Sequence, residues 1–94
     1  MNKSDLIVTL SRDMGLTQRK SEEIVNVVFN TMSRALVSRD RIEIRGFGSF
    51  AVREYRGYTG RNPKTGTSIE VDSKRLPLFK TGKELRANVD DQAI

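Results

Sequence analysis

The chain has 94 residues, 17 Lys and Arg against 12 Asp and Glu, a formal net charge of +5, and neither cysteine nor histidine. Its length indicates one domain, and 36% hydrophobic residues can build only a thin core. The missing cysteines exclude disulfides, thiolate metal sites and thiol nucleophiles, and the missing histidines exclude histidine bases and metal ligands. No apolar run is long enough to cross a membrane and no signal-peptide pattern follows Met1, so we expect a cytoplasmic protein.

Two helices are expected in the first 38 residues. Asn2 can cap the first, which carries an apolar residue at every fourth position and ends at Gly15. Thr17 can cap the second, whose apolar residues between positions 24 and 36 form a wide stripe. Such a stripe needs more partner surface than one short helix offers, so a second copy of the chain is expected to cover it in an intertwined, two-fold dimer.

Strands follow the helices. Residues 41–45 alternate strictly between polar and apolar, and the alternation resumes after a turn at 46–48, which predicts a hairpin over 41–55. Residues 53–55 and 69–71 are expected to pair as the strands of a ribbon, because the stretch between them is rich in glycine and basic residues. Residues 76–79 return to core material, and Pro77 indicates an edge strand.

The last predicted element is a short helix. Thr81 and Glu84 have the spacing of a capping box, and Leu85 and Val89 form an apolar pair behind them. The tail from Asp90 to Ile94 is expected to be frayed.

The positive charge is concentrated in the second half of the chain. Residues 53–86 carry a net charge of +5, against +2 for residues 1–52 and −2 for residues 87–94. A basic segment with little core of its own is typical of a surface that faces a polyanion. A solvated, solubilising surface explains the charge equally well at this point.

Three motifs carry a family resemblance. They are GFGSF at 46–50, TGRNPKTG at 59–66, and PLFK at 77–80 followed by Gly82 and Lys83. Over residues 1–89 the chain resembles the bacterial HU/integration host factor family, and RIEIR at 41–45 with GKELR at 82–86 is most similar to the integration host factor β-subunit pattern. The string GRNPKT is the most specific part of the match.

The resemblance implies an α+β fold: an intertwined dimer with a helical body, an antiparallel β-sheet saddle and two β-ribbon arms that embrace the minor groove of DNA. We therefore expect one domain over 1–94, with a helical dimerisation part at 1–38, a sheet at 39–80 that includes an arm at about 53–75, and a helix at 81–90. The partners would be double-stranded DNA and either the same chain or a related α-like subunit. The protein would be found at the nucleoid. No catalytic activity, metal, cofactor, membrane partner or small-molecule substrate is expected.

Pro63 is the residue expected to act on the DNA. Its ring is rigid, compact and apolar and lacks an N–H donor, which suits a wedge that unstacks and kinks a base step. The alternative is that Pro63 only shapes a turn. Beside it, Arg61 suits a narrow minor groove, Asn62 offers a donor and an acceptor to base edges, and Lys64 adds charge.

The other predicted DNA contacts fall into three groups. Arg53, Arg56, Lys74 and Arg75 on the arm, and Lys3, Lys80, Lys83 and Arg86 on the body, are expected to contact phosphates, which position the protein without reading sequence. Arg41, Glu43 and Arg45 share one face of the first strand, and the resemblance implies a part in sequence preference, with Glu43 orienting Arg45. An ordinary cross-strand charge pattern is the alternative reading for these three.

Other function classes leave weaker signals. Asp72 and Lys74 have the Asp-x-Lys spacing of some metal-dependent nucleases, but no convincing further carboxylates accompany them. Gly82 and Lys83 resemble a phosphate-binding loop, but Glu84 stands where Ser or Thr is needed. Phe50 and Phe79 are expected in the core, and Phe47 in the dimer interior beneath the saddle, so none of them is expected to form a base-stacking platform. An RNA-binding or ribosome-associated protein, or a protein-interaction module, remains the alternative.

Overall fold

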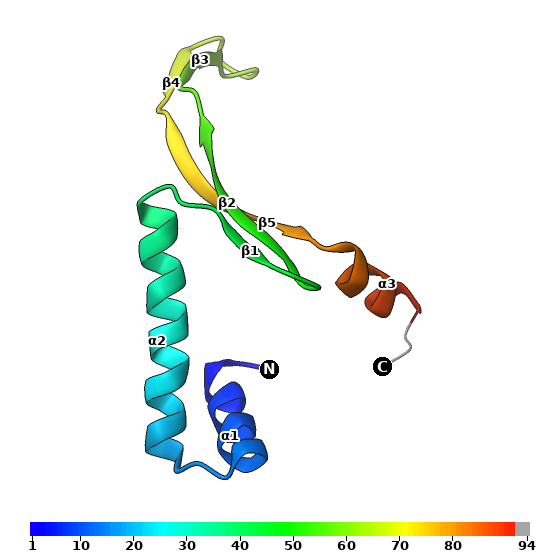
Figure 1. The fold of residues 1–94 in the computed structure, drawn as a ribbon. Helices are drawn as coiled ribbons and strands as arrows, with labels where there is room; N and C mark the ends of the chain where they lie inside the picture. Colours follow the sequence, from blue (N-terminus) through cyan, green and yellow to red (C-terminus); the bar gives the residue numbers. More distant parts are fainter. Residues whose placement is uncertain (92–94) are drawn as a thin grey trace.

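The structure, a computed structural model, describes residues 1–91 of the chain. Its N-terminal part is a helical hairpin of α1 (Lys3–Met14) and α2 (Gln18–Val37), drawn in blue and cyan in Figure 1. The Asn2 side chain accepts the Asp5 N–H at 2.9 Å, and the Asp5 carboxylate accepts the Asn2 N–H at 3.0 Å. Gly15 ends α1 in the left-handed conformation, with φ 64°. Both predicted ends of the first helix are confirmed, because the caps supply partners for terminal groups that a helix leaves unpaired.

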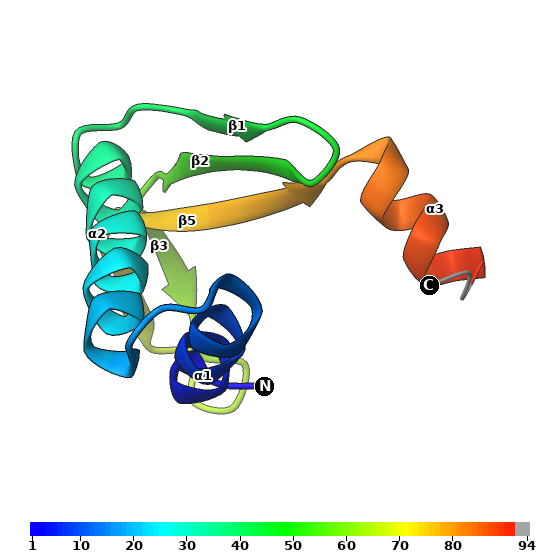
Figure 2. The ribbon, with the colours of Figure 1, turned by 60° about the horizontal axis from the view of Figure 1, so that its bottom comes forward.

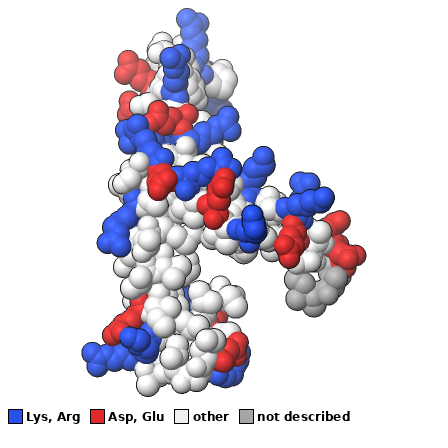
Figure 3. Space-filling model, in the orientation of Figure 1, with Lys and Arg blue, Asp and Glu red and all other residues white. Residues whose placement is uncertain are grey.

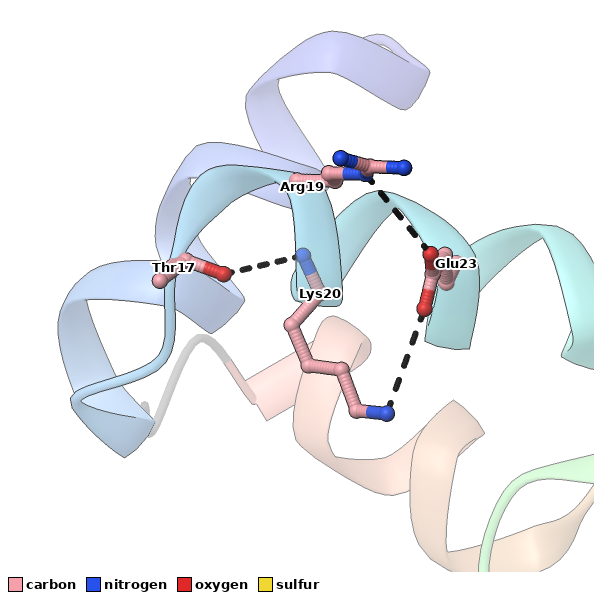
Figure 4. Close-up of polar contacts among 4 residues, drawn as sticks. All are labelled: Thr17, Arg19, Lys20 and Glu23. Carbon is pink, nitrogen blue, oxygen red and sulfur yellow. Dashed lines mark hydrogen bonds and ion pairs between the residues drawn. The ribbon is translucent and has the colours of Figure 1, made fainter.

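The start of α2 is fixed by the Thr17 hydroxyl, which accepts the Lys20 N–H at 3.1 Å (Figure 4). The predicted cap is therefore confirmed. One turn later the Glu23 carboxylate lies 4.0 Å from Arg19 and 3.9 Å from Lys20. These side chains are 59–92% exposed, so the two ion pairs contribute little to stability. The cap and the apolar face, and not the surface charges, determine where this helix begins.

An antiparallel three-stranded sheet follows, with the order β1 (Ile42–Ile44), β2 (Gly48–Tyr55), β5 (Lys74–Thr81). The β1–β2 pair confirms the predicted hairpin over 41–55. Strand β5 is at the edge of the sheet, and Pro77 lies within it. The edge position predicted from Pro77 is confirmed, since a proline has no N–H to give to a neighbouring strand.

The arm differs from the prediction in its pairing. Residues 53–55 do not pair with 69–71: Arg53 is opposite Leu76 on β5, and Ile69 is opposite Gly60. The distal ribbon consists of β3 (Tyr58–Arg61) and β4 (Ser68–Val71). The physical reason is the loop between them, in which the Asn62 N–H donates to the Thr67 carbonyl at 2.9 Å. This bond closes the hairpin at 62–67 and thereby shifts the pairing of every residue behind it.

Helix α3 (Lys83–Asp91) closes the described chain, and the expected capping box at Thr81 and Glu84 is wrong. Thr81 is still part of β5, where it pairs with Gly48, so its backbone is committed to the sheet. The Arg86 N–H donates to the Gly82 carbonyl at 3.0 Å, so the first helical turn begins one residue later than predicted. Pairing with a neighbouring strand outweighs the local capping preference here.

The chain by itself buries little. Among the described residues, Ile7 and Val25 are the only buried hydrophobic side chains, while Val28, Phe29, Phe47 and Phe79 are 43–49% exposed. The radius of gyration is 19.4 Å, against about 12 Å expected for a compact domain of this length. Figures 1 and 2 show the reason: α3 and the arm project away from the helical hairpin, and none of the described elements covers the part of the sheet between α2 and α3.

Within the described residues, no helix is both long and apolar enough to span a membrane. The same part of the chain contains no cluster of three or more acidic side chains placed to hold a metal ion.

Candidate nucleic-acid interface

The three-stranded sheet has one apolar and one charged face. Directly opposed residues in an antiparallel sheet point to the same side. Ile42, Phe50 and Phe79 are opposed across the three strands, and Val52 is opposed to Pro77. The Phe79 ring centroid lies 4.8 Å from that of Phe50 and 5.4 Å from that of Phe47. Phe50 and Phe79 thus pack together on the apolar face. Phe79 is 44% exposed in the single chain, so its predicted place in a core stays a prediction for the dimer.

The charged face carries the residues that alternate along the strands with those of the apolar face. Glu43, Ser49 and Lys80 are opposed in register, and further along the sheet Arg53 and Lys74 lie on the same side. The Arg53 guanidinium carbon lies 5.5 Å and the Lys74 Nζ 5.9 Å from the centre of the Tyr55 ring. Cations over an aromatic face are held by its quadrupole, so Tyr55 positions both charges at the root of the arm. Sequence reasoning did not assign this role to Tyr55. The signal in the sequence was Arg53 two residues away, whereas Lys74 comes opposite Tyr55 only through the strand register that the structure shows.

One hollow is lined by Arg41, Glu43 and Arg45, the three residues that were expected to share a face of the first strand. Its walls also include Ser49, Lys80 and Gly82. The Arg41 Nε lies 3.0 Å from the Glu43 Oε1, and the Arg41 Nη2 donates to the Ser49 Oγ at 3.4 Å. Glu43 is therefore paired with Arg41, whereas it was expected to orient Arg45. Arg45 lines the same hollow and is exposed.

The tip of the arm presents Pro63. The Asn62 carbonyl oxygen accepts the Gly66 N–H at 2.7 Å, and the Asn62 side-chain oxygen accepts the Lys64 N–H at 2.9 Å. These bonds close a turn around Pro63, which is exposed at its apex. The Asn62 side-chain oxygen is thereby engaged within the turn.

Arg75 lies on the other side of the sheet from Arg53 and Lys74 at the arm root. It is opposed to Glu54, on the apolar side of the sheet and away from Arg53 and Lys74. Its Nε lies 3.4 Å from the Glu54 Oε1, which also lies 3.0 Å from the Arg39 Nη2. Sequence reasoning missed Arg39 and Glu54, because neither belongs to a motif and the two are brought together only by the fold.

The remaining predicted contacts are distributed over the molecule. Lys3 begins α1, Lys83 and Arg86 lie in α3, and Arg56 and Arg61 lie on the arm; all are exposed. Figure 3 shows Lys and Arg side chains gathered over the arm and along the sheet, while much of α2 is free of charge. A second group of basic side chains lies over α3 in the same view.

A model of the bacterial DNA-binding protein family matches residues 1–90. The chain belongs to this family. It is 50% identical to the integration host factor subunit β of Shewanella woodyi over 91 residues, and the match covers 96% of each chain. The family resemblance drawn from the three motifs is therefore confirmed.

Solved structures give the same result for the fold. The HU–DNA cocrystal structure from Anabaena matches with a TM-score of 0.82 at 34% identity, over 95% of this chain and 97% of that one. HU from Thermotoga maritima matches with a TM-score of 0.67 at 27% identity, over 95% and 98% of the two chains. The predicted α+β class with a projecting ribbon is confirmed.

Proposed function

We propose that this DNA-binding family member is an architectural protein that holds double-stranded DNA across the charged face of its sheet, embraces the minor groove with its arm, and bends the duplex by inserting Pro63. The observation that carries the proposal is the tip of the arm. A rigid apolar ring is exposed at the end of a ribbon, on a turn closed by two hydrogen bonds, with Arg61 and Lys64 beside it. A wedge of this kind opens a base step and kinks the duplex.

The working unit is a dimer, of this chain with itself or with a related α-like subunit. The exposed apolar face of the sheet and the exposed stripe of α2 support this, because a chain with two buried hydrophobic residues among those described cannot stabilise itself alone. A second copy would cover both surfaces and place a second arm opposite the first.

The charged residues divide into three roles. Those at the tip enter the groove, those on the sheet and arm root hold phosphates, and those on α1 and α3 hold the flanking duplex after it has bent. Arg75 stays in the phosphate set, because only its Nε faces Glu54 and its side chain is 59% exposed. The proposed residues are Arg61, Asn62, Pro63 and Lys64 at the tip; Arg45, Arg53, Arg56, Lys74, Arg75 and Lys80 on the sheet and arm, with Arg41 and Glu43 near the bases; and Lys3, Lys83 and Arg86 on the helices.

The energetics require many phosphate contacts. Bending a site by tens of degrees costs on the order of 1–6 kcal/mol elastically, which the added contacts must exceed. Each neutralised phosphate contributes about 0.9 to the slope of log K against log salt on B-DNA. Affinity should therefore fall steeply as salt rises, whereas a protein-interaction module would show little dependence. We place the protein at the nucleoid, in an organising and not a catalytic role.

The deciding experiment is end-to-end fluorescence energy transfer on a short duplex titrated with this chain at near-physiological salt. A TA-rich duplex, a random duplex and an RNA duplex of equal length are compared. We expect the ends of DNA to approach and those of RNA to stay apart, because the RNA minor groove is wide and shallow. Equal bending of both DNAs indicates a tolerant homodimer, and preference for one indicates shape or base readout. Equal or tighter binding to RNA without DNA bending would overturn the proposal.

A further inference from the structure

One carboxylate joins three elements at the root of the arm. The Glu54 Oε1 lies 3.0 Å from the Arg39 Nη2 and 3.4 Å from the Arg75 Nε. Glu54 and Arg75 are opposed on β2 and β5, one pair before these strands end. Arg39 comes from the linker between α2 and β1. The ion pairs therefore connect the C-terminal end of the long helix to both strands of the ribbon at the point where the ribbon leaves the body.

The backbone of Arg39 is in a conformation that a side chain disfavours. Its φ is 62°, and it is the only residue other than glycine with a positive φ among those described. The conformation is held by two hydrogen bonds, from the Arg39 N–H to the Leu36 carbonyl at 3.0 Å and from the Asp40 N–H to the Ala35 carbonyl at 2.8 Å. Glycine would adopt this conformation without strain, so the arginine retained here points to a use for its side chain.

We propose that Arg39 and Glu54 are positioning residues that tie the end of α2 to the root of the arm and set the direction in which the arm leaves the body. The inference rests on the proposed function in one respect: the direction matters because the arm carries Pro63 to the DNA. Glu54 does not touch DNA in this role. It narrows the range of arm directions in the unbound protein, so the tip approaches the groove already aimed.

The physical argument follows from what else holds the arm. A two-stranded ribbon is marginally stable in water, and beyond the sheet only its own backbone pairing holds it. A carboxylate shared by two guanidinium groups from different elements restricts rotation about that junction. The three side chains are 53–59% exposed. Dissolved salt therefore screens the attraction, and the restriction should weaken as salt rises.

The test measures arm direction directly, by electron spin resonance distances between spin labels on Thr65→Cys at the tip and Asn30→Cys on α2. The chain contains no other cysteine, so both labels attach only where intended. Labelled chain is diluted with excess unlabelled chain, so that only distances within one chain are read. The variants are Glu54→Gln, Arg39→Gly and the two together. The matched control is Glu70→Gln, which removes the same charge from β4 without touching the arm root.

We expect a wider tip-to-body distance distribution in both single variants, no further widening in the double variant, and no change in the control. As salt is raised, the distance distribution of the wild-type protein should approach that of the variants. Arg39→Gly should keep the melting temperature, since it relieves backbone strain, which separates positioning from a role in stability. When the variants bind DNA, the distribution of bend angles should widen, while the affinity for DNA should change less than about threefold.

A wild-type distance distribution in both variants would overturn the inference. One such result is a Glu54→Gln variant with wild-type distances but stronger and more salt-dependent DNA binding. Glu54 would then compete with phosphate and would not position the arm. The distances are measured without DNA, so they remain interpretable if the proposed function fails.

Discussion

Ser21 is the most deeply buried side chain of the described residues, and its hydroxyl has no hydrogen-bond partner there. It lies on α2, which packs against α1, and the buried Val25 lies one turn further along the same helix. A buried hydroxyl that has given up water without gaining a protein partner is a net cost to folding. The position therefore uses the small size of serine, which allows the two helices to approach, and not its polarity.

Ser21→Ala should leave stability unchanged or raise it by about 1 kcal/mol, because it removes an unsatisfied hydroxyl and keeps the small volume. Ser11→Ala is the matched control. The Ser11 hydroxyl donates to the Leu16 carbonyl at 2.6 Å, so its loss should destabilise by about 1 kcal/mol. Urea denaturation of both variants at one protein concentration gives the comparison; a clear loss of stability in Ser21→Ala would contradict this reading.

Pro63 and Lys83 separate bending from affinity at the residue scale. Pro63→Ala should reduce the bend angle more than the affinity, because the wedge acts on base stacking. Lys83→Ala should weaken binding to all sequences and lower the salt slope by about 1, because it removes one phosphate contact. Energy transfer and salt titrations on one duplex measure both quantities, and an equal loss of both in both variants would refute this division.

At the scale of elements, the arm is a single ribbon whose strand pairs all follow one register, but its backbone hydrogen bonds form two separate sheets. The pairing of β2 with β5 and that of β3 with β4 follow the same register, yet residues 56–57 and 72–73 interrupt the ladder. A Cβ placed on Gly57 would lie 2.8 Å from the Val71 carbonyl oxygen and 2.9 Å from the Ser73 nitrogen. A Cβ has no room at this break, so only glycine fits there.

Gly57→Ala should therefore displace the distal ribbon and increase amide hydrogen exchange in β3 and β4, while the helical hairpin keeps its protection. Gly66→Ala is the control: nothing lies within 4 Å of its Cβ position, so only the strain of its φ of +71° is added, about 1 kcal/mol. Exchange measured by NMR distinguishes the two variants. Unchanged exchange in Gly57→Ala would show that the strands separate there without consequence for the arm.

At the scale of the whole molecule, the exposed apolar surface makes stability a property of the assembly. Folding and association of such a chain are coupled, so its stability depends on protomer concentration. The face that a second copy would cover is the apolar side of the sheet, which leaves the charged side available to DNA. In the proposed assembly, dimer formation and DNA binding would thus use opposite faces of the same three strands.

The melting temperature of the purified chain should rise as its concentration is increased, because mass action favours the dimer. Calorimetry over a hundredfold concentration range measures this, with the molar mass followed by sedimentation. A melting temperature independent of concentration, with a monomer in sedimentation, would refute a stabilising self-association and leave a different subunit as the required partner.

Local chemistry made much of the fold predictable from the sequence. Asn2, Thr17 and Gly15 satisfy helix ends through their own side chains or backbone freedom, and the alternation over 41–55 follows from the two-residue period of a strand. Two local patterns misled. The arm register depended on a hydrogen bond across the tip loop, and the capping spacing at Thr81 yielded to pairing with Gly48.

The sequence by itself determined the element types, the basic second half and the family motifs, because periodicity, turn chemistry and charge are properties of neighbouring residues. Only the tertiary structure decided which charges meet. It places Arg75 opposite Glu54, pairs Glu43 with Arg41 and not with Arg45, and brings Arg39 to Glu54 from positions 15 residues apart. Strand pairing and the path of the chain between elements set these meetings, and neither is encoded in the spacing of any one segment.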